Sequence, residues 1–414
     1  MSITSYPELV RIASGGNTVS IGGTNTDAFG RIRVSEPYTL FDSQNRYSSD
    51  TQYDTALTGT GVTAYQVNES AVNLSVTASG VGSVTRQTFR SFPYQPGKGL
   101  LVLATFCMDA STSANLTQRV GYFNTQNGVF FQRTGTTNSF TLRSYVSGSV
   151  SDARNISQSA WNGDKLDGTG PSGITLDATK SQILWMDFEW LGVGSVRCGF
   201  IINGTYVVCH TFTNANEITS TYMTTAILPM RYEIVSTSAI AATLKQVCSS
   251  VMSEGGYNAQ SANYTAARTT KRTGFSSTFI PLISIRLASG RLGAVVLLTK
   301  AQAFPTVTQN YEVVVLKNAT LTGASWAATV SSNVEFDQTA TALTGGVVVD
   351  QEYVSATSQN KSAARVDIGY NWDLQIGGSL AGISDIYTLA IRTLDSTPTG
   401  DAWGAMSFYD LTTQ

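Results

Sequence analysis

Two carboxylates, Asp187 and Glu189, stand two residues apart in a stretch that reads as a β-strand. Because side chains alternate along a strand, both carboxylates point to the same face. Paired carboxylates are what a glycoside hydrolase uses as its acid and its nucleophile or base. The plainer interpretation is an ion pair between Glu189 and Arg197 on a neighbouring strand. We expect the ion pair, with glycan binding and hydrolysis as the alternatives.

The sequence around these carboxylates predicts a three-stranded antiparallel sheet over residues 183–191, 196–202 and 205–212. Asn203-Gly204 is the dipeptide that favours a two-residue type I′ turn, and Gly192-Val193-Gly194 favours a second reversal. The register that follows from these turns predicts the opposed pairs Cys198–Cys209, Arg197–His210, Glu189–Arg197 and Asp187–Gly199.

Alternation along the three predicted strands assigns the side chains to two faces. One face reads as core and carries Met186, Phe188, Trp190, Cys198, Phe200, Ile202, Val207 and Cys209. The other face carries the candidate glycan- or partner-binding residues Trp185, Asp187, Glu189, Arg197, Tyr206 and His210. Aromatic rings beside charged groups are found both in sugar sites and in protein interfaces, and for this chain we favour an interface.

The sequence contains few of the residues that nucleophilic catalysis or transition-metal binding requires. His210 is the only histidine, no G-x-S-x-G segment is present, and the four cysteines lack zinc-type spacing. We therefore predict no catalytic residue, no metal and no cofactor. Cys198 and Cys209 are expected to be reduced, buried thiols, because a cytosolic origin disfavours a disulfide.

The segment Gly168-Thr-Gly-Pro-Ser-Gly173 matches the letters of a dinucleotide-binding motif. That motif needs a helix to begin inside it, whereas Pro171 and the residues that follow predict a loop entering a strand. Asp164, Asp167 and Asp177 flank this loop without the spacing of a calcium-binding loop. We expect these three carboxylates to cap local backbone groups, with a bound cation as the alternative.

Composition favours an all-β protein with a hydroxylated surface. Charged residues make up 13% of the 414 residues, against about 25% in an average protein, and Ser, Thr and Gly are abundant. With a net charge of −2, the sequence does not predict the basic surface that binds nucleic acid. No apolar run is long enough for a membrane span, and the first residues lack a signal-peptide pattern. We expect synthesis in a cytosol.

The order of strand-like runs predicts two β-sandwich domains of the jelly-roll or concanavalin-like kind. Residues 1–50 are expected to form an N-terminal arm that docks through Phe29, Tyr38 and Phe41, since these rings would be unfavourable if exposed. Residues 51–252 are predicted to form the larger sandwich, 253–275 a linker and 276–414 the smaller sandwich. Residues 238–252 fit a helix or a strand equally well. Strands of the smaller sandwich are predicted at 279–287, 292–298, 311–316, 347–353, 364–368 and 386–391.

Several passages resemble virion structural proteins of tailed bacteriophages. They are Asp27 to Tyr47 (DAFGRIRVSEPYTLFDSQNRY), Arg119 to Phe123 (RVGYF), Trp161 to Gly173 (WNGDKLDGTGPSG) and Ile183 to Phe212. The resemblance spans roughly residues 20–235. It implies a place in the virion, with no particular chemistry or site residues, and does not choose between a head decoration, a fibre and a tail or baseplate component. It also implies assembly in the host cytoplasm. We expect a non-enzymatic structural role, which includes host attachment.

From this resemblance and from the symmetry of such particles we expect other virion proteins as partners, and a homo-oligomer, first of all a trimer. Host-surface glycan is a further expected ligand, whereas nucleic acid and membrane are not. The alternative functions are a glycan-active, tail-spike-like enzyme that uses Asp187 and Glu189, and a carbohydrate-binding module.

Overall fold

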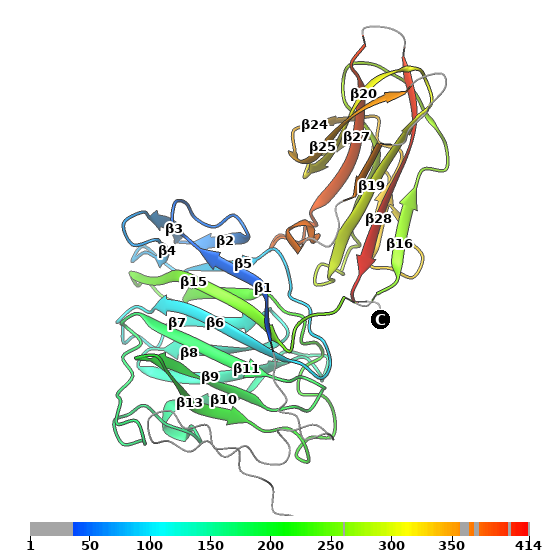
Figure 1. Ribbon diagram of the computed structural model, residues 1–414. Helices are drawn as coiled ribbons and strands as arrows, with labels where there is room; N and C mark the ends of the chain where they lie inside the picture. Colours follow the sequence, from blue (N-terminus) through cyan, green and yellow to red (C-terminus); the bar gives the residue numbers. More distant parts are fainter. Residues whose placement is uncertain (1–35, 260, 357–363, 368–371, 396–398, 413–414) are drawn as a thin grey trace, which may run out of the picture.

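The computed structural model describes residues 36–259, 261–356, 364–367, 372–395 and 399–412. The chain folds into antiparallel β-sheets that form two sandwiches, so the predicted all-β class is confirmed. The described residues include only two short 3-10 turns, η2 (Gln158–Ala160) and η3 (Trp372–Leu374), and no α-helix. No helix in the described part of the chain has the length and apolar character needed to cross a bilayer. Figure 1 shows the two sandwiches as separate bodies joined near one end.

The first sandwich consists of an eight-stranded and a seven-stranded sheet. The eight-stranded sheet contains, in spatial order, β13 (Thr205–Phe212), β12 (Val196–Ile202), β11 (Gln182–Phe188), β6 (Gly99–Cys107), β15 (Ala242–Glu254), β4 (Ala71–Val76) and β3 (Gly61–Gln66), with β1 (Pro37–Gln44) paired to β15. The seven-stranded sheet contains β10 (Ser151–Ser157), β9 (Thr137–Ser144), β8 (Gly128–Thr134), β7 (Leu116–Phe123), β14 (Met230–Ser236), β5 (Gly82–Thr88) and β2 (Tyr53–Gly59).

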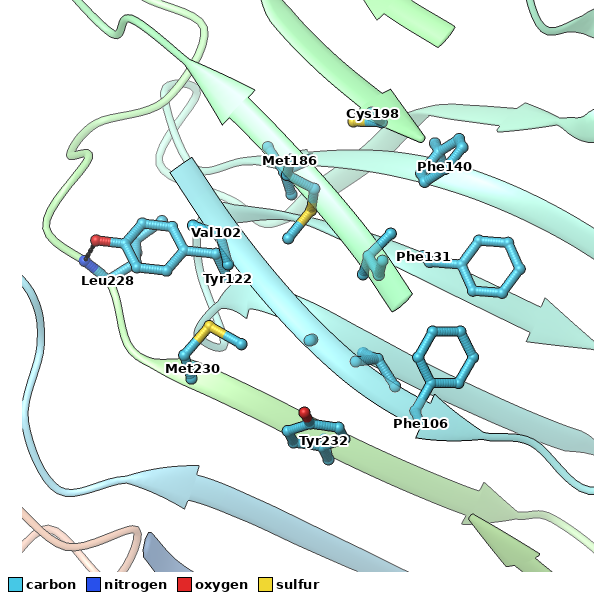
Figure 2. Close-up of a cluster of buried hydrophobic side chains, with 14 of the residues drawn as sticks. Val102, Phe106, Tyr122, Phe131, Phe140, Met186, Cys198, Leu228, Met230 and Tyr232 are labelled. Atoms are coloured by element: carbon cyan, nitrogen blue, oxygen red, sulfur yellow. Dashed lines mark hydrogen bonds between the residues drawn. The ribbon is translucent and has the colours of Figure 1, made fainter. Parts of the chain in front are cut away.

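Aromatic and sulfur-bearing side chains from both sheets fill the core of the first sandwich (Figure 2). The Phe131 ring lies 5.8 Å from Phe106, 5.5 Å from Phe140 and 5.1 Å from Phe200, measured between ring centroids. The hydroxyl of Tyr122 accepts a hydrogen bond from the Leu228 N–H at 3.1 Å, the dashed line in Figure 2. The buried tyrosine oxygen is thereby satisfied, as a buried polar group must be.

The second sandwich is smaller and has a core of its own. One of its sheets contains β16 (Asn263–Ala267), β28 (Gly400–Asp410), β19 (Val296–Pro305) and β26 (Ala364–Asp367), with β17 (Arg272–Phe275) paired to β28. The other contains β22 (Ala327–Ala328), β23 (Val334–Asp337), β18 (Ile280–Leu287), β27 (Ile386–Thr393), β20 (Gln309–Lys317) and β25 (Val347–Ala356). A two-stranded sheet of β21 (Thr320–Thr322) and β24 (Ala342–Thr344) is added to these.

The predicted boundaries shift at both ends of the first sandwich. Residues 37–44, assigned from sequence to the arm, pair with β15 as strand β1. The undecided segment 238–252 contributes most of the 13-residue strand β15. The predicted linker contains β16 and β17, both of which pair with β28. The composition of this segment did not predict these short edge strands, because a run of Ala, Thr and Asn shows no clear alternation of apolar and polar residues.

The two sandwiches also touch through a segment of the second one, residues 372–385. The Gly378 N–H donates to the Phe89 carbonyl at 2.8 Å, and the Leu380 N–H donates to the Asp54 carboxylate at 2.7 Å. The buried side chain of Gln375 donates to the Ser91 carbonyl at 2.8 Å. The second sandwich is therefore attached to the first both by the connecting chain near residue 255 and by this contact.

Candidate functional site

The hairpin at Asn203-Gly204 forms as predicted. Asn203 has φ +51° and Gly204 has φ +78°, the two positive values of a type I′ turn, and Ile202 opposes Thr205. Every residue assigned to the core face is buried or half-buried, as predicted. These are Met186, Phe188, Trp190, Cys198, Phe200, Ile202, Val207 and Cys209.

The predicted register fails beyond the first four pairs, because a β-bulge separates Cys198 from Gly199 in the β12–β13 pairing. Cys198 therefore opposes His210, and Arg197 opposes Thr211. The predicted Cys198–Cys209 and Arg197–His210 pairs were wrong. A bulge inserts one extra residue into one strand, and no feature of the local sequence predicted it.

The predicted partner of Arg197 was also wrong. Asp187, not Glu189, lies opposite Arg197 and forms the ion pair with it. Trp185, not Asp187, lies opposite Gly199. The second reversal is wider than assumed, so Phe188 pairs with Val196 and Glu189 falls beyond the end of β11, where it is exposed.

A third carboxylate completes the charged end of this face. Glu254, at the end of β15, lies across Gly99: a Cβ on Gly99 would come 3.1 Å from the Glu254 Oε2 and 3.8 Å from the Asp187 Oδ1. Burial raises the pKa of Glu254, and the negative charge of Asp187 raises it further. Glu254 escaped sequence analysis because residues 253–275 were predicted to be a linker, whereas β15 extends to Glu254. Among the residues that the structure describes, no group of His, Cys, Asp and Glu side chains is arranged to hold a metal.

Trp185 does not present its ring to solvent, as a sugar platform would require. It is only 3% exposed, and its Nε1–H donates to the Val207 carbonyl at 3.3 Å. The Tyr206 ring stands edge-on to it at 5.5 Å and is the exposed aromatic of the pair, at 51%. The expectation of two available aromatic rings is therefore corrected to one.

His210 is a buried structural residue rather than a binding residue of the outer face. Its side chain is buried, its Nδ1 accepts a hydrogen bond from the Asn162 N–H at 3.3 Å, and its ring packs edge-on against Phe212 at 4.5 Å. Burial and the nearby positive charge of Arg154 lower the pKa of His210 to about 4. The imidazole is neutral near pH 7 and is enclosed by protein.

The buried thiols of Cys198 and Cys209 are not joined by a disulfide. Burial raises the pKa of Cys209 to about 12 and the pKa of Cys198 well above its usual value. Thiols that stay protonated are poor nucleophiles. Both cysteines therefore serve as packing residues in the core.

The aspartates around the glycine-rich loop cap backbone groups, as expected. Asp164 accepts hydrogen bonds from the Leu166 and Ser172 N–H groups, Asp167 from that of Thr169, and Asp177 from that of Thr179, at 2.8–3.0 Å. Burial tends to raise the pKa of Asp164, but its hydrogen bonds hold that pKa below the usual value. The loop leads to Thr175, which bridges back to Asp167, and no helix begins inside it.

Of the three predicted docking rings, Phe29 lies outside the described residues. Phe41 is buried, 4.9 Å from Phe92 and 6.0 Å from Tyr53 between ring centroids. Tyr38 is 37% exposed and accepts a hydrogen bond from the Trp372 Nε1–H at 2.9 Å. Phe41 thus packs on the first sandwich, while Tyr38 lies at its contact with the second.

Apolar side chains follow one another across the outer face of the eight-stranded sheet. Opposed residues share a face, so the pairings Ile183–Ile201, Ile201–Tyr206 and Leu101–Met252 place neighbouring strands in one continuous surface. We name this surface the outer strip: Leu101, Leu103, Ile183, Ile201, Tyr206, Val208 and Met252. Ile183, Tyr206 and Val208 are 39%, 51% and 36% exposed, and the other four are half-buried.

The outer strip and the charged end lie side by side on the same face, because Leu101 pairs with both Asp187 and Met252. The arrangement is a mainly apolar surface with one ion pair and two further carboxylates at its margin. Such a surface suits burial against another protein, whose apolar groups would cover the strip and whose cations would meet the carboxylates.

No protein-family model matches this sequence, and no curated protein matches it. Solved structures with some likeness include a protein of unknown function from Shewanella oneidensis MR-1, with 7% identity, a TM-score of 0.34 and coverage of 54% of this chain and 88% of that one. The carbohydrate recognition domain of Emp47p has 9% identity and a TM-score of 0.33 over 56% and 100% of the two chains. The cellulose induced protein Cip1 has 11% identity and a TM-score of 0.30 over 51% and 96%. At these values the likeness does not extend to ligand or activity.

Proposed function

We propose that this chain is a non-enzymatic structural component of a tailed-bacteriophage virion that assembles through the outer face of its eight-stranded sheet. The resemblance of residues 20–235 to such proteins suggests the particle. The single observation that carries assembly is the outer strip, on which three exposed apolar side chains stand together. Contiguous apolar surface of this kind is typical of an interaction site.

The expected partners are copies of this chain, first of all in a trimer, and other virion proteins. Closed symmetry multiplies contacts between copies, so an apolar strip of modest size is sufficient for a stable ring. The contact between copies should bury more than about 1,000 Å², the lower bound for a specific interface. The charged end would then set the orientation of one copy against the next, because its three carboxylates outnumber its one cation. The carboxylates are those of Asp187, Glu189 and Glu254, and the cation is Arg197.

The test is to make the outer strip polar by the combined change Ile183→Ser, Tyr206→Ser and Val208→Ser. The matched control is Leu57→Ser with Val62→Ser, because these side chains are 50% and 48% exposed on β2 and β3, away from the strip. Mass in solution at micromolar concentration and incorporation into particles are measured for both. We expect the strip variant to lose oligomers or incorporation while its melting temperature is kept.

Unchanged mass and unchanged incorporation of the strip variant would rule out assembly through this face. Equal losses in the control variant would show that apolar surface in general, rather than the outer strip, is responsible.

A further inference from the structure

A groove of about 510 Å³ lies at the edge of the first sandwich, where β10 ends the seven-stranded sheet. Val146 and Ile218 supply apolar surface, and Ser144, Ser151 and Thr221 bring hydroxyl groups. The volume lies within the usual range for small-ligand sites, which combine an apolar surface with a few placed polar groups. None of these residues belongs to the outer strip.

Among the described residues that line the groove, Arg154 is the only charged one. Its guanidinium donates to the Asn214 side-chain oxygen and, at 2.9 Å, to the Thr213 carbonyl, and it lies over the Phe212 ring at 5.1 Å. Within the described part of the chain, the Arg154 side chain makes these two hydrogen bonds. A guanidinium has five N–H groups, so three remain for other acceptors. The guanidinium is therefore fixed in place and still able to bind an anion.

The charge of Arg154 is only partly balanced. Glu217 is close enough to influence its pKa, but the Glu217 carboxylate accepts a hydrogen bond from the Thr213 hydroxyl at 2.7 Å. The salt bridges of the described residues do not include Arg154. Burial lowers the pKa of Arg154, yet a guanidinium stays protonated at neutral pH. A carboxylate in the groove would complete the ion pair through the planar fork of the guanidinium.

Tyr222 lines the groove and places a polar group near Arg154. The residue is 4% exposed, and its hydroxyl has no hydrogen-bond partner among the described residues. An unpaired buried hydroxyl is unfavourable, so a ligand group that pairs with it would be stabilised. A ligand with several hydroxyls would pair with this group and with the surrounding serines and threonines.

We propose that this groove binds a saccharide that carries a carboxylate, such as a uronic or nonulosonic acid unit of a surface polysaccharide. The carboxylate pairs with Arg154, the sugar hydroxyls meet Ser144, Ser151 and Thr221, and the carbon face of the ring lies on Val146 and Ile218. This site goes beyond assembly through the outer strip, because it shares no residue with that surface and assigns a separate ligand.

The experiment uses the full chain on a panel of uronic- and nonulosonic-acid oligosaccharides and on the same oligosaccharides after reduction of their carboxyl groups. We expect binding to the acidic forms and about tenfold weaker binding to the reduced forms, the loss typical of one charge-assisted pair. Arg154→Gln should bind both forms equally weakly. Arg154→Lys should recover only part of the preference, since it keeps the charge and loses the fork.

Ala153→Trp supplies a second test that leaves the Arg154 hydrogen bonds in place. Ala153 is exposed and lines the groove, so an indole there should block binding while the melting temperature stays near that of the parent chain. Arg291→Gln, an exposed arginine of the second sandwich, is the control and should bind normally. Absence of binding to every acidic saccharide, equal binding to reduced saccharides by the parent chain, or normal binding by Ala153→Trp would overturn the proposal. Because oligomer formation is measured separately on the outer-strip variant, failure here leaves the assembly proposal standing.

Discussion

The indole of Trp185 packs over Gly199 of the neighbouring strand. A Cβ on residue 199 would come 2.9 Å from the Trp185 Nε1 and 1.9 Å from the Val207 carbonyl oxygen. Gly199 therefore allows a tryptophan to lie within the outer face instead of projecting from it. Tyr206, which contacts the indole edge-on, is left as the exposed aromatic of the outer strip.

Gly199→Ala should destabilise the first sandwich by roughly 1–3 kcal/mol, because the added methyl group forces the indole or β13 to move. Urea unfolding followed by tryptophan fluorescence measures this. Gly80→Ala is the control, since its Cβ would meet only the Thr60 Cγ2 at 3.5 Å, an ordinary contact. Equal stability of the two variants would show that the packing of Trp185 over Gly199 is not tight.

Gly204→Val should destabilise the first sandwich by about 1–3 kcal/mol, because a β-branched residue resists the φ of +78° that the turn requires. Asn203→Gly is the control, as glycine accepts the φ of +51° at that position. Calorimetry should show a shift of one transition in the Val variant. An unshifted transition would contradict the strain assigned to this turn.

Acidification should destabilise the fold through His210. The folded pKa of about 4 lies below the unfolded value near 6.5, so the unfolded chain binds the proton more readily. The stabilisation is complete above about pH 6.5 and is lost as the pH falls toward 4, by at most about 1.4 kcal/mol per pH unit. Comparison of the parent with His210→Gln isolates this contribution, because both share the same carboxylates.

The same histidine reports on the charge in the groove. Arg154→Gln removes the cation that helps to lower the His210 pKa, so the pKa should rise toward its ordinary value. His210 is the only histidine of the chain, so its ring proton signals can be followed by NMR without assignment. An unchanged pKa would mean that burial alone sets it.

Glu189→Gln should change the free energy of unfolding by less than about 1 kcal/mol, because Glu189 is exposed and the ion pair belongs to Asp187 and Arg197. A double-mutant cycle of Asp187→Asn and Arg197→Gln should give a coupling of about 0–1 kcal/mol, since the Arg197 side chain is 54% exposed. Release of sugar from host polysaccharide by the parent chain, lost in Glu189→Gln, would instead support a glycan-active enzyme.

Removal of residues 1–35 should leave the first sandwich folded, whereas removal of residues 1–50 should not. The longer deletion takes away β1 and the buried ring of Phe41. Phe41→Ala alone should destabilise by about 3–5 kcal/mol, as large-to-small core changes do. Circular dichroism on heating distinguishes these cases, and a stable 51–414 chain would show that β1 contributes little.

The sequence predicts best those structural features that depend on residues close together in the chain. The hairpin at Asn203-Gly204 and the core face of its strands follow from local turn chemistry and alternation. The position of Glu254 depends on pairing with β6, a strand distant in the chain, which local pattern does not contain. The bulge between β12 and β13 lies within the local hairpin, but neither turn chemistry nor alternation specifies it. β28, absent from the predicted strands, has glycines at 400 and 404 that interrupt its apolar alternation. The groove at Arg154 combines β9, β10 and the segment 218–222, and no motif links them.

Attachment of the second sandwich at two places has a mechanical consequence. The connecting chain near residue 255 would by itself allow the second sandwich to rotate. The hydrogen bonds of Gln375, Gly378 and Leu380 to the first sandwich add a second attachment. The two attachments adjoin, because the Trp372 ring packs on Tyr257 of the connecting chain at 5.0 Å, and together they resist rotation about the connecting chain. A pull on the second sandwich is therefore transmitted to β2 and to the segment around Phe89 as well as to the connecting chain.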